Sequence, residues 1–403
     1  MTDHYHGRNI AGPVERLGPG ATSAERISGI VGVCGILLCI PGFFFYRTVF
    51  FQSYLFAFLY WAGFSIGGLG VLLMHHTVGG RWGVTIRRLL EAKMRTLPVI
   101  ALLLLPILLF GLSQVYPWAR QADLAQNAIV RHKQGYLNVP FFVARVVFYF
   151  AVWLFWGFRV NRMADLQDET GDPTLRERMR AFSAPGVLVF VLTGSFAYFD
   201  WLLSSDPVFY STIYGAMLLI GDVLQTFALS IVVLVLASGP DRFHGRLDSK
   251  VLHDLGNLMF AFVIFWTYLS ASQLIIVWPA NLPQELQWYL VRVNGFWKYV
   301  AAIIAISMFA LPFLLLLSQE RKRNPIRLKR VAIFILCARA IDLFWIVEPT
   351  FRRNGFALYW TDFATFIGVG GIWLYAYLRQ LRRRPLLPLQ DARLPAPVSE
   401  VAA

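Results

Sequence analysis

Ten stretches of this sequence are each long and apolar enough to cross a lipid bilayer as a helix. A transmembrane helix needs about 20 mostly apolar residues to cover the hydrocarbon core. The stretches are continuously apolar and lack the alternation of a lipid-facing β-strand. The sequence therefore predicts an all-α polytopic membrane protein with about ten transmembrane helices. They are expected at about residues 28–46, 54–74, 97–116, 141–158, 181–203, 211–237, 252–277, 296–318, 331–348 and 359–378.

The composition agrees with lipid as the main solvent. Hydrophobic residues make up 57% of the chain and charged residues 15%, whereas soluble domains carry about 25% charged residues. The net charge of +14 would favour nucleic acid only if it formed a basic face on a soluble module. The Lys and Arg residues instead lie in short loops between apolar stretches. We therefore expect the lipid bilayer as the surroundings and no binding of nucleic acid.

Charge in the loops predicts the orientation. Of the 37 Lys and Arg residues, 27 lie in the two tails and the loops on their side, and 8 lie in the other loops. The positive-inside rule then places both termini in the cytoplasm. We expect a cytoplasmic tail over 1–27, one membrane domain over 28–378, and a Pro-rich, disordered cytoplasmic tail over 379–403. The loop segment 81–95 is expected to lie on the cytoplasmic membrane surface as an amphipathic helix.

Histidine and cysteine positions argue against a metal centre or a haem within this chain. The three cysteines form no CxxC pair and no CxxCH haem-attachment motif. No histidine lies near the middle of a predicted span, and His75 and His76 are expected at a span end. A transmembrane haem would need ligands between the spans. We therefore predict a chain without a cofactor of its own.

Three charged residues well inside predicted spans are candidates for a role at membrane depth: Asp222, Arg339 and Asp342. Arg145 also interrupts the fourth predicted span. A charge at membrane depth costs about 2.5–3.5 kcal/mol on insertion scales, so it usually marks a partner or a pathway. Arg339 and Asp342 are three residues apart and can pair on one helix. Asp222 has no nearby cation in the sequence, and it requires either a partner from another span or a bound proton.

Further ionisable residues lie near the span ends. His253 and Asp254 open the seventh span on the cytoplasmic side, and Asp200, Asp206 and Glu348 lie at the outer ends of spans five and nine. Together with the three residues within spans, they predict a proton path across the membrane. Two alternatives remain: Asp200 and Asp206 cap helices in a short turn, and the pair within span nine only sets helix packing.

Three stretches resemble a known family: LTGSFAYFDWLLSSDPVFYSTIYG (192–215), HDLGNLMFAFVIFWTYLSASQLIIVWPANLPQELQWY (253–289) and ARAIDLFWIVEP (338–349). They are similar to the ActF subunits of alternative complex III, the quinone-binding subunit 2 of quinol:cytochrome c oxidoreductases. These subunits belong to the NrfD/PsrC-like membrane proteins. The family motifs include Asp200, Asp206, His253, Asp254, Arg339, Asp342 and Glu348.

The resemblance implies two four-helix bundles, with the first and last spans packed outside them, in a bacterial cytoplasmic (inner) membrane. It also implies a role as a subunit that is not catalytic alone, with quinol as a possible ligand at an unknown site. Haem c and iron–sulfur clusters would lie in partner subunits. The implied partners are a homologous quinol-site membrane subunit, a multihaem c-type cytochrome, an iron–sulfur, molybdopterin-like subunit and, in some assemblies, a haem-copper oxidase.

Two other functions fit the same spans. The chain could be a purely structural scaffold that anchors peripheral redox subunits. It could also be a secondary transporter, for which we would expect helices broken by Gly or Pro at corresponding positions of two halves. The prolines within spans, Pro41, Pro106, Pro185 and Pro312, show no such pairing in the sequence.

Overall fold

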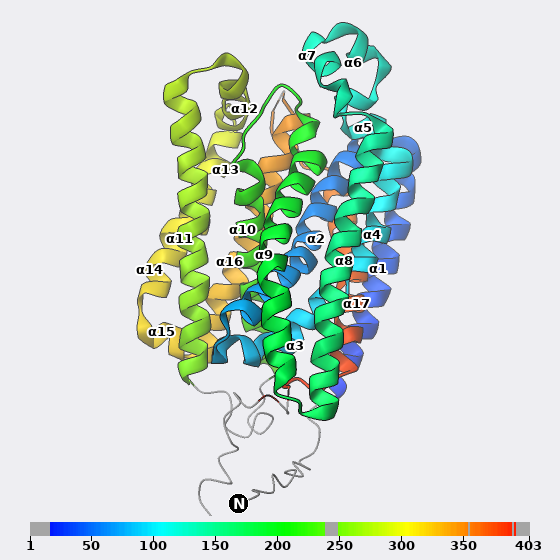
Figure 1. Cartoon of the computed structure of the whole chain (residues 1–403). Helices are drawn as coiled ribbons and strands as arrows, with labels where there is room; N and C mark the ends of the chain where they lie inside the picture. The colour runs from blue at the N-terminus through cyan, green and yellow to red at the C-terminus, as the bar shows by residue number, and fades with distance from the viewer. Residues whose placement is uncertain (1–16, 238–248, 354, 389–390, 392–403) are drawn as a thin grey trace, which may run out of the picture.

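The computed structural model describes residues 17–237, 249–353, 355–388 and 391, and over these residues the fold is all-helical. Long helices lie side by side along one direction (Figure 1). The eight longest are α1 (Pro19–Phe45), α2 (Arg47–Val78), α8 (Val139–Thr170), α9 (Thr174–Trp201), α10 (Tyr214–Ala237), α11 (Ser249–Ala280), α16 (Pro325–Phe351) and α17 (Trp360–Arg382).

Shorter helices occupy two more of the predicted spans and form the connections. The third span consists of α4 (Leu97–Pro106), the π-helix η1 (Ile107–Gly111) and α5 (Leu112–Val115). The eighth consists of α13 (Trp297–Ile304), the π-helix η5 (Ala305–Ala310) and α14 (Leu311–Leu317). The connections contain α3 (Arg81–Met94), η2 (Pro117–Ala119), α6 (Gln121–Gln126), α7 (Ala128–His132), η3 (Lys133–Gly135), η4 (Leu203–Ser205), α12 (Pro283–Val293) and α15 (Gln319–Arg323).

The prediction of a polytopic helical membrane protein is confirmed in its coarse form. Among the described residues, eight helices are long and apolar enough to cross a membrane. The helices α16 and α17 are also long, with 27 and 23 residues, but they fall outside that set. Both are less apolar because they carry buried polar residues that face other helices. The number of ten spans and the division into two four-helix bundles remain predictions.

The two ends of the molecule differ. The helix α1 begins and α17 ends at one end, which we call the basal end (Figure 1). At the opposite, apical end lie the short helices α6, α7 and α12. The predicted orientation makes the basal end cytoplasmic.

Local sequence sets the ends of several long helices. Asn138 caps α8 by accepting a hydrogen bond from the backbone N–H of Phe141. Asn324 caps α16 in the same way, and proline follows it at the first helical position, where no N–H is required. The α8 helix ends at Gly171, which adopts a left-handed conformation (φ 67°) that glycine tolerates best.

The helices α2 and α10 form the centre of the molecule. Within the most apolar 18-residue segment of each helix, 89% of the α2 residues and 78% of the α10 residues are buried. The two helices contact each other, and both also contact α9 and α16. A helix that is apolar all round is typically enclosed by other helices. Polar residues on α2 and α10 therefore face protein rather than lipid.

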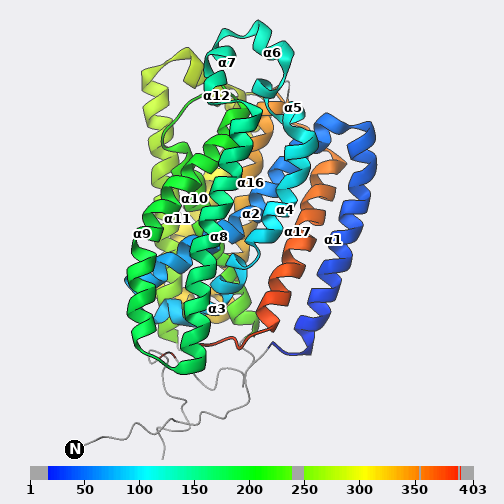
Figure 2. The ribbon, with the colours of Figure 1, turned by 45° about the vertical axis from the view of Figure 1, so that its right-hand side comes forward.

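The first and last spans pack against each other at the edge of the molecule (Figure 2). A Cβ atom at Gly32 would lie 2.6 Å from the backbone nitrogen of Ile372, and one at Gly35 would lie 2.5 Å from Cα of Gly368. Small residues of this kind let two backbones approach closely within a bilayer. The placement of α1 and α17 beside each other agrees with the resemblance, which puts the first and last spans outside the remaining helices.

We expect Gly35→Leu to separate α1 from α17. The side chain has no space beside Gly368, and overpacking of this kind costs about 1–3 kcal/mol. The midpoint of thermal unfolding in detergent should fall. Gly20→Leu is the matched control on the same helix, because nothing lies within 4 Å of a Cβ atom there. Equal midpoints for the two variants would contradict the close approach of the two backbones.

Two boundary predictions from the sequence are wrong. The helix α1 begins at Pro19, within the predicted tail. After α17 ends at Arg382, Leu386 and Leu387 are buried, so the first part of the C-terminal tail is packed. The rest of the two tails lies largely outside the described residues. Pro106 lies beside the π-helix η1 in the third predicted span, and Pro312 lies beside the π-helix η5 in the eighth. The sequence did not indicate that these two prolines correspond.

The prediction that 81–95 lies on the membrane surface is also wrong. The helix α3 is buried from Gly83 to Met94, including its charged residues. The amphipathic pattern suggested a face toward water, but the charged face instead contacts α8 and the segment after α17. Partners far away in the sequence supply the countercharges, which the local pattern could not reveal.

Candidate functional site

A cluster of ionisable groups lies between the central helices. Arg339 and Asp342 of α16 form the ion pair expected from their spacing. The Arg339 guanidinium also lies 3.6 Å from Oδ1 of Asp222 on α10. All three residues are at most 2% exposed. Asp222 thus has a partner from another span, which was one of the two arrangements that the sequence allowed.

A tyrosine from a third helix joins the cluster. The Tyr198 hydroxyl on α9 donates a hydrogen bond to Asp222. Nearby, the Gln225 amide donates to the backbone carbonyl of Tyr60 on α2, at 3.2 Å. Tyr198 was not among the residues predicted from the sequence, although it lies within the FAYFDW motif. Its role depends on which face of α9 meets α10, and the motif alone does not give that face.

Glycines make the space for this cluster. A Cβ atom at Gly63 on α2 would lie 2.5 Å from Oδ1 of Asp222, and one at Gly221 on α10 would lie 2.3 Å from Cζ of Arg339. Any larger residue would displace the charged groups. The polar atoms of the cluster therefore lie directly against helix backbones.

Asp200 belongs to a different cluster. It receives two hydrogen bonds from Arg145 of α8, each of 2.8 Å, and one from the Tyr149 hydroxyl at 2.6 Å. Residues two apart on a helix point to nearly opposite faces, so Asp200 faces α8 while Tyr198 faces α10. The alternative that Asp200 caps a short turn is wrong, because it lies inside α9 with its carboxylate paired to Arg145.

Glu348 takes part in a third cluster, near the apical end. Its carboxylate lies 2.9 Å from the guanidinium of Arg352. Arg352 also pairs with Asp362 of α17 at 2.6 Å, and Asp362 accepts a hydrogen bond of 2.5 Å from Ser53 of α2. This cluster ties α2, α16 and α17 together. The sequence predicted Glu348 but not its partners.

The remaining predicted residues lie near the two ends of the molecule. Asp206 is 3.4 Å from the exposed Arg353, and its side chain makes no capping hydrogen bond in the described part of the chain. His253 and Asp254 lie at the start of α11, with 3.9 Å between their charged groups. The eight predicted residues thus form separate groups, and only Asp222, Arg339 and Asp342 come together at depth.

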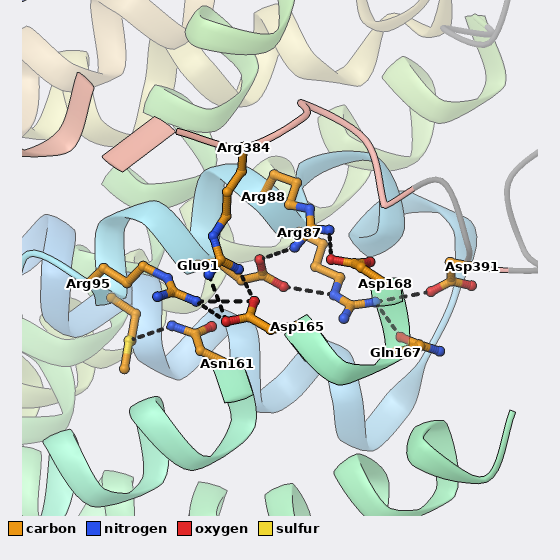
Figure 3. A network of polar contacts seen from close by, with 11 residues as sticks. Arg87, Arg88, Glu91, Arg95, Asn161, Asp165, Gln167, Asp168, Arg384 and Asp391 are labelled. Carbon is orange, nitrogen blue, oxygen red and sulfur yellow. Dashed lines mark hydrogen bonds and ion pairs between the residues drawn. The ribbon is translucent and has the colours of Figure 1, made fainter. Parts of the chain in front are cut away.

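A fourth group of charges surrounds α3 at the basal end (Figure 3). Glu91 accepts hydrogen bonds from Arg87 at 2.8 Å and from Arg88 at 2.7 Å. Arg88 also pairs with Asp168 of α8, and Arg384, beyond α17, pairs with Asp165 of α8. Further along the tail, Asp391 lies 3.4 Å from Arg87. These contacts connect α3, α8 and the C-terminal segment, and none of them was predicted from the sequence.

Two hollows lie beside α16. One, of about 270 Å³, is lined by residues of α10, α11, α12, α13, η5 and α16. Six of its 18 lining residues are aromatic, and Asp342 and Gln273 contribute polar groups. The other, of about 500 Å³, is an almost wholly apolar groove that includes Phe56, Phe296 and Phe344. The first combines apolar walls with a few polar groups, as small-molecule sites commonly do.

No metal-binding group of three or more His, Cys, Asp or Glu residues is present over the described ranges. His4, His6 and His244 lie outside those ranges. His75 and His76 lie buried at the basal end of α2, where His75 packs against Trp82. The chain matches no model of a known protein family, and no curated protein matches it.

Proposed function

We propose that this chain is an integral subunit of a respiratory quinol:acceptor oxidoreductase and provides part of a proton path through its central cluster. The acceptor would be a cytochrome c or an oxidase. The three sequence stretches that resemble alternative complex III subunits support the assignment to such a complex. The chain would be a multi-pass protein of the bacterial inner membrane with both termini in the cytoplasm.

The observation that supports the proton path is the charge balance of the central cluster. Two carboxylates, Asp222 and Asp342, share the guanidinium of Arg339. With both acids ionised, one buried negative charge has no cation in this cluster. Burial strongly disfavours such a charge, and a proton is the simplest ion that can neutralise it. An acid that holds and releases a proton at membrane depth is what a proton relay requires.

The redox chemistry would belong to the partners. Haem c and iron–sulfur groups would be held by the multihaem cytochrome, the iron–sulfur, molybdopterin-like subunit and, where present, the oxidase. Quinol would bind mainly at the homologous membrane subunit. The 270 Å³ hollow beside Asp342 is the candidate place for a quinone contact in this chain, since it has aromatic walls and a carboxylate.

The test uses the complex purified from its native membrane through a tag on this chain. In Asp222→Asn and Asp342→Asn, the rate of quinol oxidation in the first turnover, normalised to haem content, is expected to stay the same. The number of protons taken up per electron is expected to fall at least severalfold. Asp362→Asn is the matched control, because it also removes a buried carboxylate that pairs with an arginine. Proton uptake is measured with a pH indicator in reconstituted vesicles.

Two results would contradict the proposal. If the tagged chain is isolated without haem-containing partners and without quinol oxidation, the assignment to a redox complex fails. If both Asn variants take up protons as the wild type does, the path fails. A scaffold remains the second candidate, favoured by the clusters of Arg145 and Arg352, whose ion pairs join neighbouring helices. A scaffold predicts that all three variants alter only assembly or thermal stability.

A further inference from the structure

A polar stripe runs along α10 from the central cluster toward the basal end. Asp222, Thr226 and Ser230 recur every four residues, so they share one face of the helix. This face meets α2, where a Cβ atom at Gly67 would lie 2.5 Å from Oγ1 of Thr226 and 2.4 Å from the carbonyl oxygen of Asp222. Because Gly67 has no side chain, the α2 backbone packs directly against the polar stripe of α10.

Lys93 of α3 meets the basal part of the stripe. Its Nζ donates to the Thr226 carbonyl at 2.9 Å and to the Ser230 hydroxyl at 2.6 Å. The side chain is fully buried. The two oxygens that it contacts are neutral, and no carboxylate among the described residues lies within ion-pair distance of it. The nearest acid along α3, Glu91, already pairs with Arg87 and Arg88.

A lysine in this setting differs from the arginines of the other clusters. A guanidinium stays charged in proteins, whereas a buried lysine amine can lose and regain its proton. The two oxygens that Lys93 contacts can accept hydrogen bonds from an ammonium group, and they can also accept them from a neutral amine. Arg145, Arg339 and Arg352 each form an ion pair with a carboxylate. They therefore provide a permanent positive charge and do not exchange protons.

Thr226 lies between Lys93 and Asp222. Its hydroxyl oxygen is buried and has no hydrogen-bond partner within the described residues. Four residues of α-helix rise about 6 Å, a separation that a hydroxyl and one water molecule can bridge. An unsatisfied buried hydroxyl requires a hydrogen-bond partner, and a water molecule bound at Thr226 would supply it.

We propose that Lys93 is a proton-loading amine that receives protons from basal water and passes them to Asp222 by way of Thr226. The amine nitrogen binds a proton from hydronium. One ammonium N–H bond then breaks, the proton moves through water held at the Thr226 hydroxyl, and an O–H bond forms on the Asp222 carboxylate. No electrons are transferred. The inference rests on the proposed function, because it gives the central cluster its basal entrance.

The test measures proton uptake from the basal side of the reconstituted complex, per electron and per assembled complex. Lys93→Met and Lys93→Arg are both expected to slow uptake at least tenfold, since neither side chain exchanges a proton. Thr226→Val should slow uptake severalfold, and Thr226→Ser should restore it. Lys322→Met is the control: Lys322 is also mostly buried and donates to a neutral oxygen, that of Asn257 at 2.6 Å, but it lies away from the α10 stripe.

The outcomes separate this inference from the proposed function. Wild-type uptake in Lys93→Arg would overturn it, because a permanent charge that supports transport shows a purely structural role for Lys93. Equal uptake in Thr226→Val and Thr226→Ser would overturn the route through the hydroxyl. If the Lys93→Met chain does not assemble, the Lys93→Arg and Thr226 variants still decide the question. If Asp222→Asn blocks uptake while the Lys93 variants do not, only the inference fails; if none blocks it, the proposed function fails.

Discussion

Arg339→Met is expected to destabilise the protein more than any other single substitution in the central cluster. The change leaves Asp222 and Asp342 buried without their shared cation. Removing one partner of a buried ion pair costs about 3–5 kcal/mol, because the other charge stays in a medium that solvates it poorly. The variant should accumulate poorly in membranes and unfold at a much lower temperature in detergent, as followed by tryptophan fluorescence.

A rescue variant tests whether charge is the cause. Combining Arg339→Met with Asp222→Asn and Asp342→Asn removes the cation and both anions, so most of the stability should return. Arg327→Met is the control on the same helix, since Arg327 is half exposed and its partner Glu320 is largely exposed. Exposed pairs contribute about 0–1 kcal/mol. A triple variant as unstable as Arg339→Met would show that side-chain packing, not charge, explains the loss.

Glu91→Gln is expected to loosen the contact of α3 with its surroundings. Glu91 is 1% exposed and accepts hydrogen bonds from Arg87 and Arg88 with different carboxylate oxygens. Glutamine has one acceptor oxygen and no charge, so two buried guanidinium groups lose their shared anion. The expected loss is about 3–5 kcal/mol by the same argument. The unfolding temperature in detergent should fall accordingly.

Limited proteolysis gives a second measurement of this change. Arg384 and Asp391 tie the C-terminal segment to the charges around α3, so trypsin should cleave after the exposed Arg383 faster in Glu91→Gln. Glu169→Gln is the control, because Glu169 is exposed near the end of α8. Unchanged cleavage and an unchanged unfolding temperature in Glu91→Gln would mean that the arginines find other anions.

The parts of the fold that depend on local pattern could be predicted from the sequence. Apolar stretches of about 20 residues identified the long helices, because the bilayer fixes the length that a helix must cover. The pairing of Arg339 with Asp342 followed from their spacing on one helix. The residues that need a partner at depth were also identified, since charges there are rare and costly.

The parts that depend on which helix faces meet could not be predicted. Tyr198 and Asp200 are two residues apart in one motif, yet one contacts α10 and the other α8. The charges of α3 suggested a surface helix because their countercharges Asp168 on α8 and Asp391 beyond α17 are 80 and 304 residues away in the sequence. Lys93 was assigned to that surface for the same reason, and its contact with α10 emerged only from the arrangement of the helices.

The close contact of α1 with α17 has a consequence for biogenesis. The first span leaves the ribosome long before the last one exists, because more than 300 residues separate Gly35 from its neighbour Gly368. During synthesis the glycine face of α1 therefore borders lipid or an insertion factor. The contact between α1 and α17 forms only after α17 has been synthesised, and Arg382 can then pair with Glu25. The packing of α1 thus depends on a segment that is synthesised more than 300 residues later.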